Sequence, residues 1–171
     1  MALLKFKREE EPISGSHSPE VEAFLQNYSI EVMPRTAEKI DDFRALLPKG
    51  TRVYIAHIEG TPIADMVATA KRLNAQGFPV MPHFPARIIN DKATLTDWIA
   101  RYQGEANVEQ ALLLAGGVDK PHGDYDSSMQ LLESGAFDQA GFKRLHVAGH
   151  PEGNKDIDPS GGTASVDAAL H

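Results

Sequence analysis

Cysteine is absent from the 171 residues of this chain. Its absence excludes a disulfide framework and a thiolate metal site, and leaves no mark of an oxidising compartment. No apolar run approaches the ~20 residues of a membrane span, and the N-terminus lacks an apolar segment long enough for a signal peptide. We therefore expect a cytoplasmic protein without a membrane partner.

Positive charge is also scarce, because 17 Lys and Arg stand against 24 Asp and Glu, for a formal net charge of −7. The basic residues are scattered, so nucleic acid is not an expected partner. With 42% hydrophobic residues, the chain is long enough for one domain with a core. Residues 1–17 are polar, and we expect them to form a flexible arm before a domain over residues 18–171.

Short apolar segments alternate with amphipathic ones along the chain. Strands are predicted at 28–33, 52–57, 78–83, 111–115 and 144–149. Helices are predicted before the first strand and between the others, with starts near Ser18, Thr36, Thr61, Asp91 or Thr94, and Ser127 or Ser128. The helix that starts at Thr36 is expected to run through Leu47, where Pro48 and Gly50 end it. The unbroken apolar run at 111–115 is typical of a strand covered on both faces. Strict alternation of strand and helix indicates an α/β protein with a parallel sheet.

Two architectures are compatible with this pattern. An open, doubly wound sheet of five strands fits the length, whereas a (β/α)8 TIM barrel typically takes about 250 residues. The doubly wound reading lacks support from phosphate-binding motifs, because no Gly-x-Gly-x-x-Gly follows the first strand and no P-loop is present. The glycine cluster at 115–123 fits neither motif.

Each predicted strand has, near its C-terminal end or just after it, residues capable of acid–base, ligand or phosphate chemistry. They are Glu31, His57, His83, Gly116, Gly117, Asp119, Gly149, His150 and Glu152. The C-terminal ends of parallel strands share one edge, where function is found in such proteins. Glu31 lies between Ile30 and Val32, which predicts a desolvated carboxyl group. Each histidine taken singly is explained equally well by a structural role.

Four segments together resemble the methylenetetrahydrofolate reductase family: residues 29–36, 81–84, 113–117 and 147–153. The resemblance runs from about residue 26 to the end of the chain. That family has a (β/α)8 barrel that binds FAD, takes hydride from NAD(P)H and reduces 5,10-methylenetetrahydrofolate to 5-methyltetrahydrofolate. The resemblance implies a divergent, shortened member with about the first five β/α units, and a folate as substrate.

The resemblance places the family's catalytic acid on Glu31. A glutamic acid with a raised pKa would protonate the departing folate nitrogen, which creates the iminium that a hydride can reduce. The cofactor-binding positions implied for FAD are His57, His83, Gly116, Gly117, Asp119, Gly149, His150 and Glu152. The chain departs from the family at Ala115 and Gly117, where an arginine and an aspartate are usual, and at Ser165, where a basic residue is usual.

These departures keep two other functions open. One is a non-catalytic or flavin-independent relative that binds folate. The other is a metal-dependent barrel hydrolase or lyase that uses the three histidines 57, 83 and 150 with Asp119 or Glu152, although no close His pairing supports it. Five strands would leave two sheet edges uncovered, so we also expect either a homo-oligomer or a fragment of a longer protein.

Overall fold

The structure is a computed structural model that describes residues 18–149, so residues 1–17 and 150–171 lie outside the described residues. It contains five strands: β1 (Ser29–Val32), β2 (Arg52–Ile55), β3 (Val80–Pro85), β4 (Gln110–Leu114) and β5 (Arg144–Val147). The helices are α1 (Pro19–Phe24), α2 (Pro34–Ala37), α3 (Ile63–Ala75), α4 (Lys92–Ala106), α5 (Ser128–Glu133) and α6 (Ala136–Gln139). The five predicted strands are confirmed, with boundaries within two residues.

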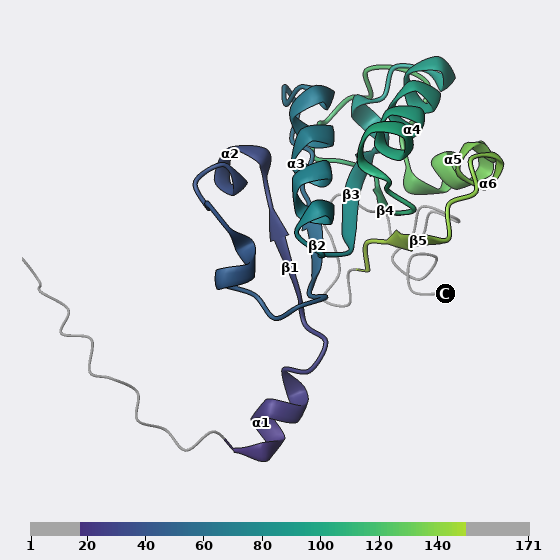
Figure 1. The fold of residues 1–171 in the computed structure, drawn as a ribbon. Helices are drawn as coiled ribbons and strands as arrows, with labels where there is room; N and C mark the ends of the chain where they lie inside the picture. Colours follow the sequence, from purple (N-terminus) through teal and green to yellow (C-terminus); the bar gives the residue numbers. More distant parts are fainter. Residues whose placement is uncertain (1–17, 150–171) are drawn as a thin grey trace, which may run out of the picture.

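The strands form one parallel sheet whose order, β1-β2-β3-β4-β5, is the order of the chain (Figure 1). A doubly wound sheet reverses its strand order partway, so that alternative is wrong. The α/β class and the parallel sheet are confirmed. Sequential order is also the arrangement of strands in part of a β/α barrel.

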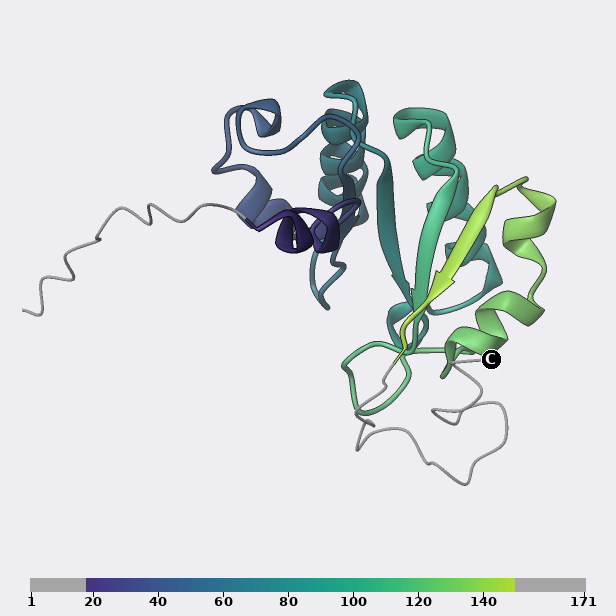
Figure 2. The same cartoon turned by 90° about the horizontal axis from the view of Figure 1, so that it is seen from below.

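The helix layer is built from α3 and α4, which pack side by side (Figure 1). Asp91 caps α4 as predicted, since its Oδ1 accepts a hydrogen bond from the Thr94 amide at 2.7 Å. The apolar positions of both helices are buried: Met66, Val67, Ala70 and Leu73 in α3, and Leu95, Ile99 and Tyr102 in α4. By contrast, α1 has no buried residue and lies apart from this layer (Figures 1 and 2).

The side chains of each strand alternate between two faces of the sheet. One face packs against the helices and contributes Ile30, Val32, Val53, Ile55, Val80, Phe84, Ala111, Leu113 and Leu145 to the core. The strand register puts the remaining side chains on the opposite face, which we call the inner face. It carries Ser29, Glu31, Arg52, Tyr54, Met81, His83, Gln110, Leu112, Arg144 and His146.

The predicted coverage of the fourth strand on both faces is wrong. Ala111 and Leu113 are fully buried against the helices, but Leu112 and Leu114 are only half-buried. Within residues 18–149 no second layer of helices or strands covers the inner face at β4. Its apolar residues there remain partly accessible.

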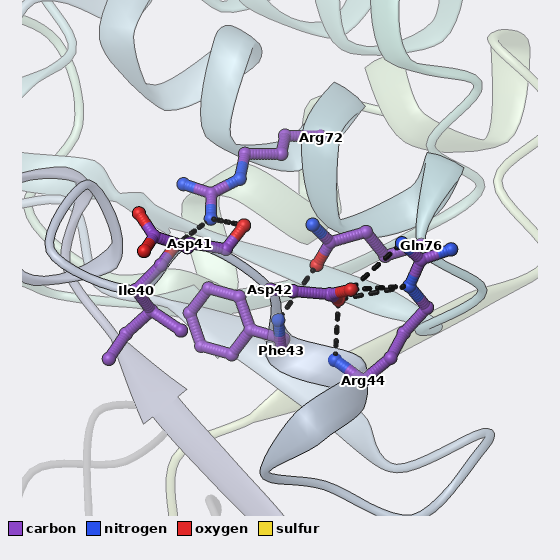
Figure 3. Close-up of polar contacts among 7 residues, drawn as sticks. All are labelled: Ile40, Asp41, Asp42, Phe43, Arg44, Arg72 and Gln76. Carbon is purple, nitrogen blue, oxygen red and sulfur yellow. Dashed lines mark hydrogen bonds and ion pairs between the residues drawn. The ribbon is translucent and has the colours of Figure 1, made fainter.

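The predicted helix from Thr36 through Leu47 is also wrong. The chain forms only α2 and a 3-10 turn at Phe43–Ala45. The Arg72 guanidinium donates hydrogen bonds to the carbonyl groups of Ala37, Ile40 and Asp41, and lies 5.6 Å from the Phe43 ring centroid. Figure 3 shows how Arg72 and Gln76 hold this connection. A continuous helix would use those carbonyl groups internally.

Candidate functional site

Four chemically active side chains from four strands gather on the inner face. They are Glu31 in β1, Tyr54 in β2, His83 in β3 and His146 in β5. Register places Glu31 beside Tyr54, and places Leu112 between His83 and His146. Of these four residues, the sequence analysis singled out only Glu31 and His83.

Glu31 and His83 are paired across the intervening strand β2. The carboxylate Oε2 of Glu31 lies 3.3 Å from Nε2 of His83, an ion-pair distance without the angle of a hydrogen bond. Strands are spaced about 4.8 Å apart, so in a flat sheet these two side chains would stand about 10 Å apart. Both side chains therefore reach over β2, and the wider contact between Tyr54 in β2 and His146 in β5, made across two intervening strands, indicates that the sheet is concave on its inner face.

The expected burial of Glu31 is wrong. Its side chain is 58% exposed, because Ile30 and Val32 point to the helix layer while Glu31 points to the open inner face. The carboxyl group is therefore accessible to a molecule on that face. Its neighbour His83 is the buried member of the pair, with 7% exposure.

Burial lowers the pKa of His83 to about 4, and the nearby His57 lowers it further. The Glu31 carboxylate would act in the opposite direction, but it is largely solvated, so water screens its charge. His83 is consequently a neutral imidazole near pH 7. A neutral imidazole beside an accessible carboxyl group can exchange a proton with it.

Tyr54 and His146 form the second pair of the inner face. The Tyr54 hydroxyl lies 3.3 Å from Nδ1 of His146, and the two ring centroids are 6.1 Å apart in an edge-on arrangement. The Tyr54 ring also meets His83 edge-on, with centroids 6.3 Å apart. Tyr54 thus touches both histidines, and the four residues form one connected group.

His57 lies on the helix side of the sheet. Its ring packs against Trp98 with centroids 4.7 Å apart, and its Nε2 donates a hydrogen bond to the Thr61 carbonyl group at 3.0 Å. Burial lowers the pKa of His57. This geometry is typical of a structural histidine that closes the turn before α3.

Gly116, Gly117 and Asp119, which the sequence indicated, lie in the connection between β4 and α5. Gly116 adopts a φ of +100°, and a side chain there would approach the Cβ atom of Pro85 to 3.1 Å, so it serves a tight turn. Gly117 and Asp119 are exposed, as is Gly149 after β5. His150 and Glu152 lie outside the described residues.

Arg87 and Glu59 anchor that connection to the same edge of the sheet. Arg87 pairs with Asp126 at 2.6 Å, and Glu59 pairs with His122 at 2.9 Å. The backbone amide of His122 also donates to the Arg87 carbonyl group at 2.8 Å. These contacts hold the connection across the C-terminal end of β3.

The described residues that the resemblance assigns to FAD do not form one site. His57 packs into the helix layer, Gly116 shapes a turn, and Gly117 and Asp119 are exposed in a loop. Only His83 faces the inner face, where its buried Nε2 lacks a hydrogen-bond partner among the described residues. The set does not fit the cofactor's diphosphate and ring together, and we derive no step through FAD.

The cavities, acidic and histidine side chains, and helices of the described residues do not indicate a second functional site. Cavities of ≈ 290 and ≈ 500 Å³ lie at the N-terminal ends of the strands, near Pro79 and Lys49, and another of ≈ 290 Å³ lies along β1. Among residues 18–149, no three His, Asp or Glu side chains are arranged to hold a metal ion. None of the helices described there is long and apolar enough to cross a membrane.

Tyr54 and His146 are the functional candidates that sequence reasoning missed. A signal was present, because polar and apolar residues alternate at Arg52–Ile55 and again at Arg144–Val147. Such alternation predicts a strand with one face outside the apolar core. No protein-family model matches the chain, so the geometry of the inner face and the sequence resemblance carry the functional assignment.

Proposed function

We propose that this chain carries the proton-donating site of a folate-reducing enzyme similar to methylenetetrahydrofolate reductase. The observation that carries the proposal is the Glu31–His83 pair, with an accessible carboxyl group 3.3 Å from a buried imidazole. The sequential parallel strands and the concave inner face support a fold like the first five units of a (β/α)8 barrel. Glu31 is the acid in this proposal.

Reduction of 5,10-methylenetetrahydrofolate begins with opening of its five-membered ring. The bond from the methylene carbon to one nitrogen breaks as that nitrogen receives a proton from Glu31, which leaves an iminium at the other nitrogen. A hydride then converts the iminium to a methyl group, and a proton from solvent restores Glu31. NAD(P)H is the proposed hydride source, as the resemblance implies.

Glu31 and His83 have different tasks in this scheme. The exposed carboxyl group of Glu31 can reach a substrate on the inner face, whereas His83 is enclosed. With a pKa of about 4, His83 carries no acidic proton to give near pH 7, so Glu31, whose side chain is 58% exposed, takes its new proton from solvent, and His83 positions the carboxyl group. Proton transfer of this kind typically contributes 10²- to 10⁴-fold to a rate.

The test is formation of 5-methyltetrahydrofolate by the full chain and by Glu31→Gln, measured by chromatography with NADH and NADPH in turn, with and without added FAD. Glu31→Gln keeps the shape but removes the proton, so we expect a loss of about 10²-fold or more. Glu59→Gln is the matched control, because it removes a carboxylate that pairs with His122 outside the inner face. Undiminished turnover by Glu31→Gln would refute the role of the acid.

The second candidate function is folate binding without reduction. The dispersal of His57, Gly117 and Asp119, which the resemblance assigns to FAD, favours it. A chain that binds a reduced folate but forms no methyl product under any of these conditions would establish this alternative.

A further inference from the structure

On the inner face, two imidazole nitrogen atoms make no hydrogen bond to a described residue, although one of them, Nε2 of His83, lies 3.3 Å from the Glu31 carboxylate. Nε2 of His83 and Nε2 of His146 are both buried, and neither has a hydrogen-bond partner among the described residues. Buried polar atoms are almost always paired in native proteins, so two of them on one face need an explanation. A bound ligand that supplies the missing partners is such an explanation.

The contact with Tyr54 is compatible with a proton on Nε2 of His146. The Tyr54 hydroxyl has one proton, and its only partner among the described residues is Nδ1 of His146 at 3.3 Å. Where the Tyr54 hydroxyl is the donor of this hydrogen bond, the imidazole proton lies on Nε2. Burial lowers the pKa of His146, and the positive charges of Arg52 and Arg144 lower it further, so the ring stays neutral. In the tautomer in which Nδ1 accepts, His146 offers one N–H group, at Nε2.

The surface between the two histidines is apolar. Leu112 lies in register between His83 and His146 and is half-buried. Met81, beside Tyr54 in register, is fully buried, so the accessible apolar surface here is that of Leu112. An apolar floor with polar groups at its margins suits a flat heterocycle, which needs contact with its faces and hydrogen bonds at its edge.

We infer that Tyr54 and His146 form a binding pair for the acceptor edge of a pterin ring, with the Nε2–H group of His146 as donor. This inference rests on the proposed function and adds the residues that hold the substrate's ring. Glu31 is on the same face, beside Tyr54 in register, so a ring held by His146 lies on the side of the sheet where the acid is. Neither Tyr54 nor His146 belongs to the site residues that were assigned from the sequence.

The test is the dissociation constant of the full chain for 5-methyltetrahydrofolate, measured by calorimetry. His146→Leu removes the donor and Tyr54→Phe removes the hydroxyl group that fixes it, and we expect each to weaken binding about three- to tenfold. His146→Gln carries an N–H group near the position of Nε2 and should restore most of the affinity. Tyr102→Phe, which removes a buried hydroxyl group from the helix layer, should leave binding unchanged.

Two further probes identify the part of the ligand that is recognised. p-Aminobenzoylglutamate lacks the pterin ring, so its binding should not respond to Tyr54→Phe or His146→Leu. Riboflavin presents a flavin ring without a diphosphate. The pterin assignment would be overturned if His146→Leu weakened the binding of riboflavin more than the binding of 5-methyltetrahydrofolate. It would also be overturned if the variants weakened p-aminobenzoylglutamate binding as much as folate binding, or if the chain bound no folate.

Comparison of turnover with folate affinity distinguishes failure of the reductase proposal from failure of the binding pair. Glu31→Gln should lower turnover by about 10²-fold or more while it leaves the dissociation constant for 5-methyltetrahydrofolate nearly unchanged. If folate binding depends on His146 but no variant or unmodified chain reduces folate, the reductase proposal fails and the binding pair stands. If the chain reduces folate but Tyr54→Phe and His146→Leu leave the dissociation constant unchanged, the binding pair fails and the reductase proposal stands.

Discussion

The hydroxyl group of Tyr54 reaches the imidazole of His146 although strands β3 and β4 lie between them in the sheet. Three strand spacings amount to about 14 Å in a flat sheet. A separation of 3.3 Å between the two side-chain atoms requires that β2 and β5 incline toward each other over the inner face. The contact therefore measures the curvature of the sheet as well as local chemistry.

Tyr54→Phe should destabilise the fold, whereas Tyr102→Phe should not. The first removes a hydrogen bond that joins β2 to β5, with an expected loss of about 0.5–1.5 kcal/mol. The second removes a buried hydroxyl group that has no hydrogen-bond partner among residues 18–149, so stability should stay equal or rise. Urea unfolding of both variants checks this, and equal losses would contradict the contrast.

Stability should rise with pH between about 4 and 6.5. The pKa of folded His83 is about 4 and its ordinary value is 6.5, so in this window the unfolded chain binds more protons than the folded chain. The contribution is complete above pH 6.5 and is lost as pH falls through about 4. His57, whose pKa burial also lowers, adds a slope of the same sign.

The measurement is the free energy of unfolding across this pH window for the unmodified chain and for His83→Gln. The variant should show a smaller slope, with the remainder due to His57. The pKa of Asp91 is lowered from 3.8 by hydrogen bonds from Thr94, so its protonation makes the free energy of unfolding depend on pH at lower pH as well. An unchanged slope in His83→Gln would show that His83 is not a buried neutral imidazole.

Two glycine substitutions should have opposite effects on stability. Gly104 lies within α4 with open space around it, so Gly104→Ala should stabilise the protein by about 0.5–1 kcal/mol. A side chain at Gly123 would overlap the Asn90 carbonyl group, so Gly123→Ala must displace the connection between β4 and α5. We expect a loss of about 1–3 kcal/mol, read from the urea midpoint. Stabilisation by Gly123→Ala would contradict the packing at Asn90.

Arg72→Lys should destabilise the connection between β1 and β2 even though charge is kept. The planar guanidinium donates to three carbonyl groups and lies over Phe43, and a lysine ammonium cannot reproduce that fork. The expected loss is about 1–3 kcal/mol, measured by urea unfolding. Arg101→Lys is the control, because Arg101 makes an exposed pair with Glu105 and should change stability little.

Much of the fold could be predicted because local signals and packing agree. The cap at Asp91, the apolar positions of α3 and α4, and the five strands follow from periodicity and turn chemistry. The predicted helix at residues 36–47 failed because its stability depends on a distant residue. Arg72, in α3, binds the carbonyl groups there, and no local pattern contains that information.

The candidate site was only partly predictable for a related reason. The sequence indicated Glu31 and His83, but their contact depends on the strand order and register that place β1 and β3 on either side of β2. Tyr54 and His146 are separated by 92 positions in the chain, and only register and curvature bring them together. The burial expected at Glu31 failed because adjacent apolar residues in a strand point to the opposite face.

The sequential order of the strands has a consequence for how the protein folds during synthesis. Each strand pairs with the strand that precedes it in the chain, so its pairing partner has already been synthesised when it emerges. Domains emerge from the ribosome N-terminal end first, and the sheet can therefore grow strand by strand from β1. The contact between Tyr54 and His146 forms only when β5 docks, which makes it a reporter for the last of the five strands to join the sheet.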